Sequence, residues 1–260
     1  MSRDRAIEDA IRAQCKALKL PGVAKGFHDV ARQARDAGWE PEEYLLELLE
    51  AEVRSRSENV SKQRRQEAHF PATKVLDNFD FAAQPNLDRD LVMRLSRCEW
   101  VAKAEPVLLA GPVGTGKTHL AIALGIEATG RRLRVRFHRA DDLVRELVEA
   151  KNGQVLGRIL KRMDRLDLLI VDELGFVPFD RTGAELLFNL LANRYQRRAT
   201  MITSNLAFSE WNQVFGDNTK MTAALLDRLA ENAHVITTTG SSFRARRRGL
   251  VDAPPKPDAE

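Results

Sequence analysis

Apolar residues recur every three or four positions through residues 1–66 of the chain. This spacing predicts three amphipathic helices, because it places the apolar side chains on one face of each helix. Pro41 suits the first turn of the third helix. The expected apolar stripe of that helix is formed by Leu45, Leu46, Leu49 and Val53. We therefore expect a small all-α N-terminal domain.

A different pattern begins at Pro106, where short apolar runs alternate with helical stretches. Runs that are apolar at every position are typical of strands buried on both faces, and their alternation with helices predicts right-handed β-α-β crossovers. The expected strands are residues 107–110, 133–137, 168–171, 200–203 and 234–237. The sequence thus predicts an α/β domain whose mostly parallel sheet is covered by helices on both faces.

Proline and polar residues mark the predicted domain boundaries. Residues 67–86 contain two prolines and scattered aromatic side chains, as in an extended connector. A further helix is expected at residues 87–101, where the α/β domain (87–250) begins. The tail, residues 251–260, contains three prolines and is expected to be disordered.

The composition is that of a globular protein with a substantial core, since 43% of the 260 residues are hydrophobic and 30% are charged. The charged N-terminus leads into no apolar stretch, so neither a secretory signal nor a membrane span is expected. Cys15 and Cys98 stand alone, which argues against a zinc site or a disulfide framework. We expect a cytoplasmic protein. The net charge of +4 permits a nucleic-acid partner without requiring one.

The pattern Gly111-x-x-x-x-Gly116-Lys117-Thr118 lies between a predicted strand and a predicted helix. Such glycines let consecutive backbone N–H groups point inward, and the helix N-terminus favours a negative charge. Lys117 can reach the β- and γ-phosphates of a nucleotide, and the Thr118 hydroxyl can be a ligand of Mg²⁺. A nucleoside triphosphate is therefore the predicted ligand. Its predicted binding residues are Gly111, Pro112, Val113, Gly114, Thr115, Gly116, Lys117, Thr118 and His119.

Two carboxylates, Asp172 and Glu173, follow a fully apolar predicted strand. They are expected at the carboxyl edge of the sheet, beside the predicted phosphate site. Asp172 is predicted to hold Mg²⁺ together with Thr118. Glu173 is predicted to orient and polarise the water that attacks the γ-phosphate.

Two further polar residues are candidates for catalysis. Asn205 ends a later strand and could sense the γ-phosphate, or it could be an ordinary polar strand terminus. Arg228 lies in an amphipathic helix, where an ion pair with Asp227 or Glu231 is the simpler local interpretation. An arginine that reaches into a neighbouring subunit could instead neutralise charge in the transition state.

Four segments together resemble the AAA+ ATPases of the IstB/DnaC type, and the pattern is closest to the IstB transposition helpers of insertion sequences. The segments read GPVGTGKTHLA, LLIVDELG, ITSN and LLDRL. The chain departs from the family's common pattern at Val113, where relatives often have proline, which should not affect a backbone phosphate contact. It also leaves little or no room for a C-terminal helical lid after Thr239, and Arg244 is a weak candidate for a substitute sensor.

The resemblance implies an ATPase that uses ATP and Mg²⁺ and forms homo-oligomers with ATP at the subunit interfaces. It makes Asn205 the expected sensor and Arg228 the expected residue donated to a neighbouring site. It also implies binding and remodelling of double-stranded DNA, with little sequence preference, and recruitment of a partner transposase. ATP hydrolysis would then time the life of the DNA-bound assembly.

Several basic clusters could contact DNA, and each could equally be a solvated surface. The arginines at 131, 132, 134, 136 and 139 could contact phosphate or protect an edge strand, and the basic end of the third helix (residues 54–65) could clamp DNA. The candidates drawn from the resemblance and from the densest basic run are Lys151, Arg158, Lys161, Arg162, Arg244, Arg246, Arg247 and Arg248. No base-reading motif is present, so steep salt dependence is expected.

Two other functions share parts of this pattern. A DnaC-like loader of a replicative helicase would use the same ATPase with a different N-terminal partner. A small-molecule kinase would also use the P-loop, but the pair Asp172 and Glu173 favours hydrolysis of ATP by water.

Overall fold

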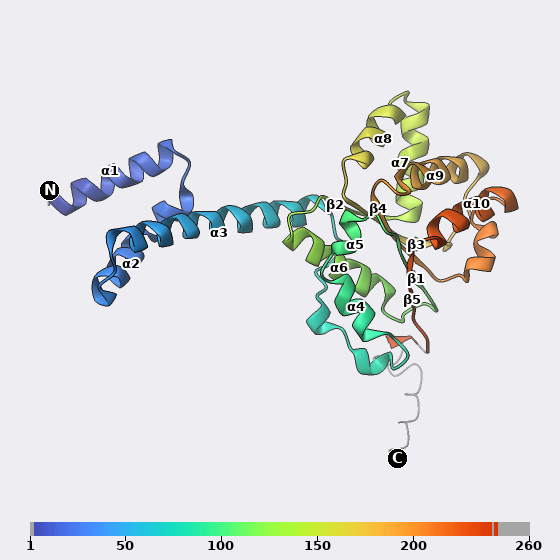
Figure 1. Cartoon of the computed structure of the whole chain (residues 1–260). Helices are drawn as coiled ribbons and strands as arrows, with labels where there is room; N and C mark the ends of the chain where they lie inside the picture. The colour runs from blue at the N-terminus through green and yellow to red at the C-terminus, as the bar shows by residue number, and fades with distance from the viewer. Residues whose placement is uncertain (1–2, 241, 244–260) are drawn as a thin grey trace, which may run out of the picture. The chain divides into compact units, whose positions relative to one another are not determined.

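The computed structural model describes residues 3–240 and 242–243 (Figure 1). The chain divides into two compact units, Met1–Gln63 and Arg64–Glu260. The helices α1 (Arg3–Ala17), α2 (Pro21–Ala37) and α3 (Pro41–Glu67) form the first unit, and α3 continues past the boundary. None of the helices in the described residues is both long enough and apolar enough to cross a membrane.

The buried face of α3 differs from the prediction. Leu48 packs with Phe27 and Val30 of α2, whereas the expected stripe of Leu45, Leu46, Leu49 and Val53 is exposed. A buried carboxylate fixes this choice, because Glu52 of α3 accepts hydrogen bonds from the first N–H groups of α2. Those N–H groups have no partner within their own helix. The prediction of a buried stripe is therefore wrong, although the helix itself is correct.

A five-stranded parallel sheet forms the centre of the second unit, in the order β2-β3-β4-β1-β5. Its strands are β1 (Val107–Ala110), β2 (Val135–Arg139), β3 (Leu168–Leu174), β4 (Ala199–Ser204) and β5 (His234–Thr237). The predicted α/β fold is thereby confirmed. The second strand begins two residues later than expected, since the chain still turns at Arg132, whose φ is 66°.

Helices cover both faces of the sheet (Figure 1). Alternate strand residues point to opposite faces, so Leu109 joins one core cluster and Leu108 the other. The first cluster includes residues of α4 (Arg89–Leu95), α5 (Glu99–Ala102) and α6 (Lys117–Gly130). The second includes residues of α7 (Ala140–Asn152), α8 (Leu156–Asp164), α9 (Arg181–Arg194) and α10 (Thr219–Ala230), together with the 3₁₀ helix η3 (Phe208–Gln213).

The single helix expected at residues 87–101 is two short helices. Cys98 separates α4 from α5 with a left-handed φ of 61°, a conformation that interrupts a right-handed helix. The Trp100 Nε1–H bonds the carbonyl of Leu95 across the break at 2.9 Å. This contact keeps both helices packed on the same core cluster.

Candidate functional site

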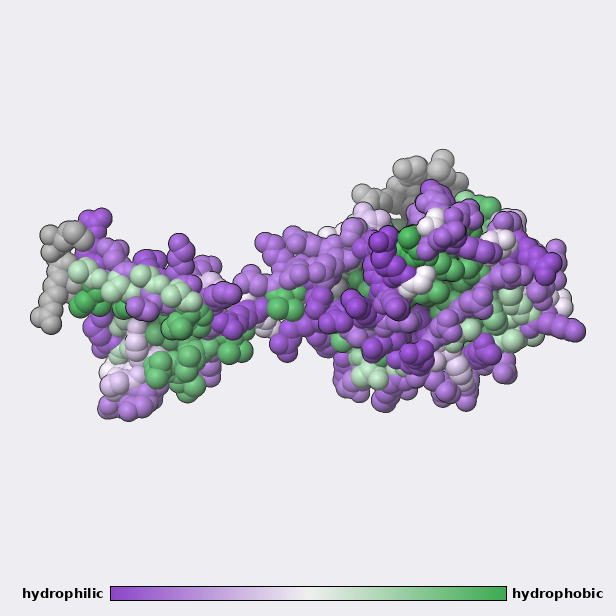
Figure 2. Space-filling model, turned by 90° about the horizontal axis from the view of Figure 1, so that it is seen from above, coloured by the Kyte–Doolittle hydropathy of each residue, from purple (hydrophilic) through white to green (hydrophobic). Residues whose placement is uncertain are grey.

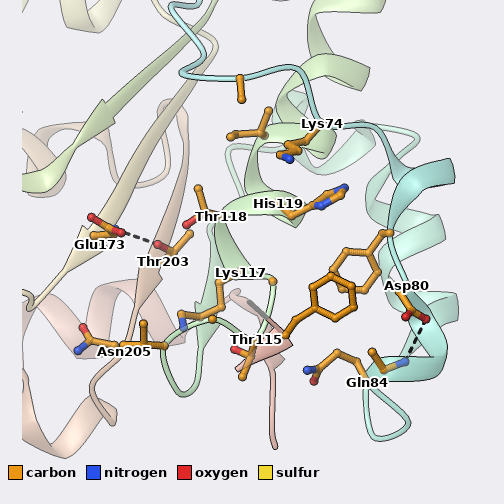
Figure 3. Close-up of a pocket in the computed structure, with 18 of the residues that line it drawn as sticks. Lys74, Asp80, Gln84, Thr115, Lys117, Thr118, His119, Glu173, Thr203 and Asn205 are labelled. Atoms are coloured by element: carbon orange, nitrogen blue, oxygen red, sulfur yellow. Dashed lines mark hydrogen bonds between the residues drawn. The ribbon is translucent and has the colours of Figure 1, made fainter. Parts of the chain in front are cut away.

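A cavity of about 490 Å³ opens at the carboxyl ends of the strands (Figure 3). Its volume lies within the range of pockets that hold small ligands. Seven of the nine predicted nucleotide-binding residues line it, namely Val113 to His119, and Glu173, Thr203 and Asn205 approach from the ends of β3 and β4. Gly111 and Pro112 are the two that do not.

The loop between β1 and α6 has the backbone shape that its glycines predict. Gly111 and Gly116 have φ values of 143° and 98°, a region that side chains disfavour. A Cβ atom at Gly116 would also lie 2.7 Å from the ring of Phe79. The Lys117 Nζ donates to the carbonyl oxygens of Gly111 and Pro112, each at 2.6 Å. The ammonium group is thus held over the loop at the N-terminus of α6.

Three side chains form a buried polar cluster beside the loop. The Thr118 hydroxyl lies 2.9 and 3.1 Å from the two carboxylate oxygens of Asp172, and the Thr203 hydroxyl donates to Asp172 at 2.6 Å. Asp172 is only 3% exposed, and this burial raises the pKa of its carboxyl despite both hydrogen bonds. A buried carboxylate beside a hydroxyl is the hard oxygen donor set that Mg²⁺ prefers, so these residues fit the ion.

We expect the conservative change Asp172→Asn to stabilise the nucleotide-free protein. A raised pKa means that the ionised carboxylate is less stable in the folded state than in the unfolded state at neutral pH. The neutral amide removes this cost, which in the wild type would fade as the pH falls towards the raised pKa.

Thermal unfolding in EDTA should therefore give a higher Tm for Asp172→Asn, while the Tm gain from Mg²⁺ and ATP should shrink. Asp142→Asn serves as the control, because Asp142 is 52% exposed. A lower Tm without nucleotide and an unchanged Mg²⁺-dependent gain would contradict the assignment.

Glu173 lies at a strained point of the backbone, with φ at 60°. Its N–H donates to the Thr203 hydroxyl at 2.9 Å, so one threonine fixes both acidic residues (Figure 3). Its carboxylate pairs with Arg139 at 3.1 Å. Arg139 ends β2, next to β3 in the sheet. Sequence reasoning noted this arginine only as part of a basic cluster, because the pairing of β2 with β3 cannot be read from spacing.

Asn205 follows β4 and lines the cavity. Its Oδ1 atom is buried and has no hydrogen-bond partner among the described residues. An unpaired buried amide oxygen is costly, and a water or ligand in the cavity could satisfy it. The position therefore suits the role predicted for a γ-phosphate sensor.

The segment of residues 67–86 contributes a wall of the cavity that sequence reasoning missed. It contains two 3₁₀ turns, η1 (Leu76–Asn78) and η2 (Phe81–Ala83). Phe79 packs edge-on against His119 with ring centroids 5.3 Å apart, while Lys74, Asp80 and Gln84 also line the cavity (Figure 3). The aromatic residues of this segment were the available signal, because a solvated connector rarely carries so many.

Arg228 of α10 does not line the cavity of its own chain. Its guanidinium lies 5.7 Å from the ring centroid of Phe188. Within the described residues it forms no ion pair with Asp227 or Glu231. The structure therefore does not bring Arg228 together with the other catalytic candidates in one subunit.

The DNA-binding candidates in the described residues lie near one another in the chain, on α7 and α8. Lys151 is in the last turn of α7, and Arg158, Lys161 and Arg162 are exposed on α8. The opposite side of α8 packs Leu156, Ile159, Leu160 and Met163 into the core. Arg162 forms an ion pair with Glu146. Arg244, Arg246, Arg247, Arg248 and the predicted tail lie outside the described residues, as does the chain that would form a lid.

Comparison with known sequences places this site in context. Residues 13–250 match the family described as IstB-like ATP binding protein. The chain is 36% identical over 231 residues to a protein of Pseudomonas aeruginosa named for ATP binding in insertion sequence IS21, covering 89% of this chain and 87% of that one. It is 33% identical to the corresponding protein of insertion sequence IS5376 from Geobacillus stearothermophilus, covering 95% and 98%.

Solved structures with this fold include DnaA from Aquifex aeolicus bound to AMPPCP, with a TM-score of 0.56 and 21% identity. That match covers 69% of this chain and 54% of DnaA. A structure of DnaI matches with a TM-score of 0.54 and 22% identity, covering 64% of this chain and 91% of that one. Identities this low establish the likeness of fold alone.

Proposed function

The chain belongs to the family of IstB-like ATP binding proteins, and from this premise we propose that it is an ATPase that assembles on double-stranded DNA, remodels it and recruits a transposase. The observation that carries the catalytic part is the convergence of Lys117, Thr118, Asp172 and Glu173 on one cavity. The names of its relatives, which refer to insertion sequences, support the role in transposition over a DnaC-like role in loading a replicative helicase.

The proposed reaction is hydrolysis of ATP to ADP and phosphate. Lys117 would exchange its carbonyl partners for oxygens of the β- and γ-phosphates. Thr118 and Asp172 would hold Mg²⁺, which neutralises charge on those phosphates. Glu173 would accept a proton from the attacking water, and Asn205 would hold the γ-phosphate or that water. The Arg139 ion pair to Glu173 would have to loosen before the carboxylate can act.

ATP is proposed to join neighbouring subunits. Arg228 lies outside the cavity of its own chain and is therefore available to a neighbour. A cationic side chain that enters an adjacent site can stabilise the charge of the transition state. Its contact with Phe188 would hold the guanidinium in place until then.

The exposed side of α8 is proposed as the DNA contact. It presents Arg158 and Lys161, neither of which forms an ion pair among the described residues, next to Arg162. Phosphate contacts by lysine and arginine supply most affinity that is independent of sequence. Their number also sets the salt dependence of binding.

Assembly on duplex DNA tests the proposal as a whole. We expect purified protein with ATP and Mg²⁺ to form multi-subunit complexes on duplexes of unrelated sequence, measured by sedimentation, and to hold its cognate transposase only in that state. Protein that ignores DNA with ATP, ADP and no nucleotide alike would leave an ATPase without the proposed role.

Reversing two charges of α8 tests the DNA contact itself. Arg158→Glu/Lys161→Glu should weaken binding at least tenfold, since the loss of each phosphate contact lowers the slope of log K against log salt by about 0.9. The matched control is Arg97→Glu/Lys103→Glu, which changes the same charge at exposed positions on the other face of the sheet. Equal losses in both variants would indicate a general charge effect and refute the assignment to α8.

A further inference from the structure

The exposed face of α3 carries an unusual concentration of large apolar side chains. Leu45, Leu46, Leu49, Val53 and Val60 are 55%, 58%, 49%, 68% and 37% exposed, respectively. We call these five residues the α3 stripe. Hydrophobic residues are visible on the surface of the N-terminal helices in Figure 2. Contiguous apolar surface of this kind on a small unit marks a site of association.

The stripe is a continuous feature of the helix. Positions 45, 49, 53 and 60 recur at close to 3.6-residue spacing and so lie along one side of α3. The neighbouring side faces α2, where Leu48 and Glu52 are buried. The core of this unit is small, since its main apolar cluster contains only Phe27, Val30 and Leu48 as buried members. Burial of the stripe would therefore add substantially to the apolar surface removed from water.

The charges of α3 are separated along its length. The first part contains Glu42, Glu43, Glu47 and Glu50 without a basic residue, and the later part contains Arg54, Arg56, Lys62, Arg64 and Arg65 with Glu58. Glu42 and Arg56 lie on the same side as the stripe, seven residues before and after Leu49. Arg56 uses Nε and Nη2 for Glu52 and the Lys19 carbonyl, while its Nη1 has no hydrogen bond among the described residues.

We propose that α3 pairs with α3 of a second copy of this chain, in antiparallel orientation about a two-fold axis at Leu49. This arrangement places Leu45 level with Val53 of the partner, because both lie four residues from the axis. It likewise places Glu42 level with Arg56 of the partner. One patch thus satisfies itself, as a two-fold interface requires.

A second copy fits better than other occupants. The stripe offers no positive charge for DNA phosphates at its centre, and its acidic end would repel them. A helix with one acidic and one basic end is complementary to an antiparallel copy of itself. The contact requires no nucleotide, and it therefore adds a second interface to the ATP-bridged assembly proposed above.

A cysteine on the axis provides the sharpest test. In full-length Leu49→Cys the two introduced thiols would face each other, within the Cα separation of less than about 7 Å that a disulfide needs. The native Cys15 and Cys98 are buried. Mild oxidation without nucleotide should give a disulfide-linked dimer in high yield. Met93→Cys, at a 47% exposed position of α4, should stay largely unlinked.

A charge on the axis provides the second test. Leu49→Glu would set two carboxylates against each other, a clash of several kcal/mol that should raise the dimer dissociation constant at least about 100-fold. Sedimentation of the nucleotide-free protein would measure it, with Met93→Glu as the control. Because Leu49 is exposed in the single chain, far-UV circular dichroism and ATP affinity should not change.

The outcomes separate this proposal from the proposed function. Monomeric wild-type protein at tens of micromolar, or Leu49→Cys that links no better than Met93→Cys, would overturn the α3 interface. If such protein still bound ATP and assembled on DNA, the proposed function would stand without it. A Leu49→Glu variant that remains dimeric would assign self-association to another surface and would also overturn the proposal.

Discussion

Lys117→Ala should bind ATP about 10²–10⁴-fold more weakly than the wild type. The ammonium group is positioned by two backbone carbonyls at 2.6 Å, where it can turn to the β- and γ-phosphates. A hydrogen bond to a charged group contributes about 1.5–3 kcal/mol. Two such contacts give about 3–6 kcal/mol, and each 1.4 kcal/mol corresponds to a factor of about ten in Kd.

Titration calorimetry with ATP and Mg²⁺ measures this loss. Lys103→Ala is the control, because Lys103 is exposed and distant from the lining of the cavity. The folded state should survive in Lys117→Ala, since the substitution leaves α6 and its buried apolar residues in place. If the variant retained affinity within threefold of the wild type, the nucleotide would have to bind somewhere other than this loop.

Glu173→Gln should bind ATP normally and hydrolyse it about 10²–10⁴ times more slowly, the range that a positioned general base contributes. Glutamine has nearly the same shape, so it tolerates the φ of 60° as well as glutamate does and keeps the N–H contact to Thr203. It cannot accept a proton from water. Complexes on DNA should consequently persist after ATP is added, because the step that ends them is blocked.

Phosphate release and the lifetime of DNA complexes are the two measurements for this variant. Glu185→Gln is the control, because it removes an exposed carboxylate that only pairs with Arg181. Mixing Glu173→Gln with Arg228→Ala subunits extends the test. An intact Glu173 site beside an intact Arg228 can then form at some interfaces, so partial recovery is expected. Normal turnover by Glu173→Gln alone would place the base elsewhere.

Much of the catalytic centre could be predicted because its residues are close together in the sequence. The glycines around Lys117, and Asp172 with Glu173 after an apolar strand, are local patterns whose physics does not depend on the rest of the fold. The helices and strands were largely predicted for the same reason. The buried stripe of α3 was predicted wrongly, because spacing reveals an apolar face without revealing which of two faces meets α2. The break at Cys98 was missed, because no proline or glycine marks it.

The amino-acid sequence by itself determined the family, the phosphate-binding loop and the order of elements that makes a parallel sheet. Only the tertiary structure decided that β4 lies between β3 and β1, which puts Thr203 against both acidic residues. It also decided that Arg139 reaches Glu173, and that Phe79 and Gln84 form a wall of the cavity. These contacts join residues that lie 30 or more positions apart. Local spacing cannot specify them, because strand order and packing bring such residues together only when the whole chain folds.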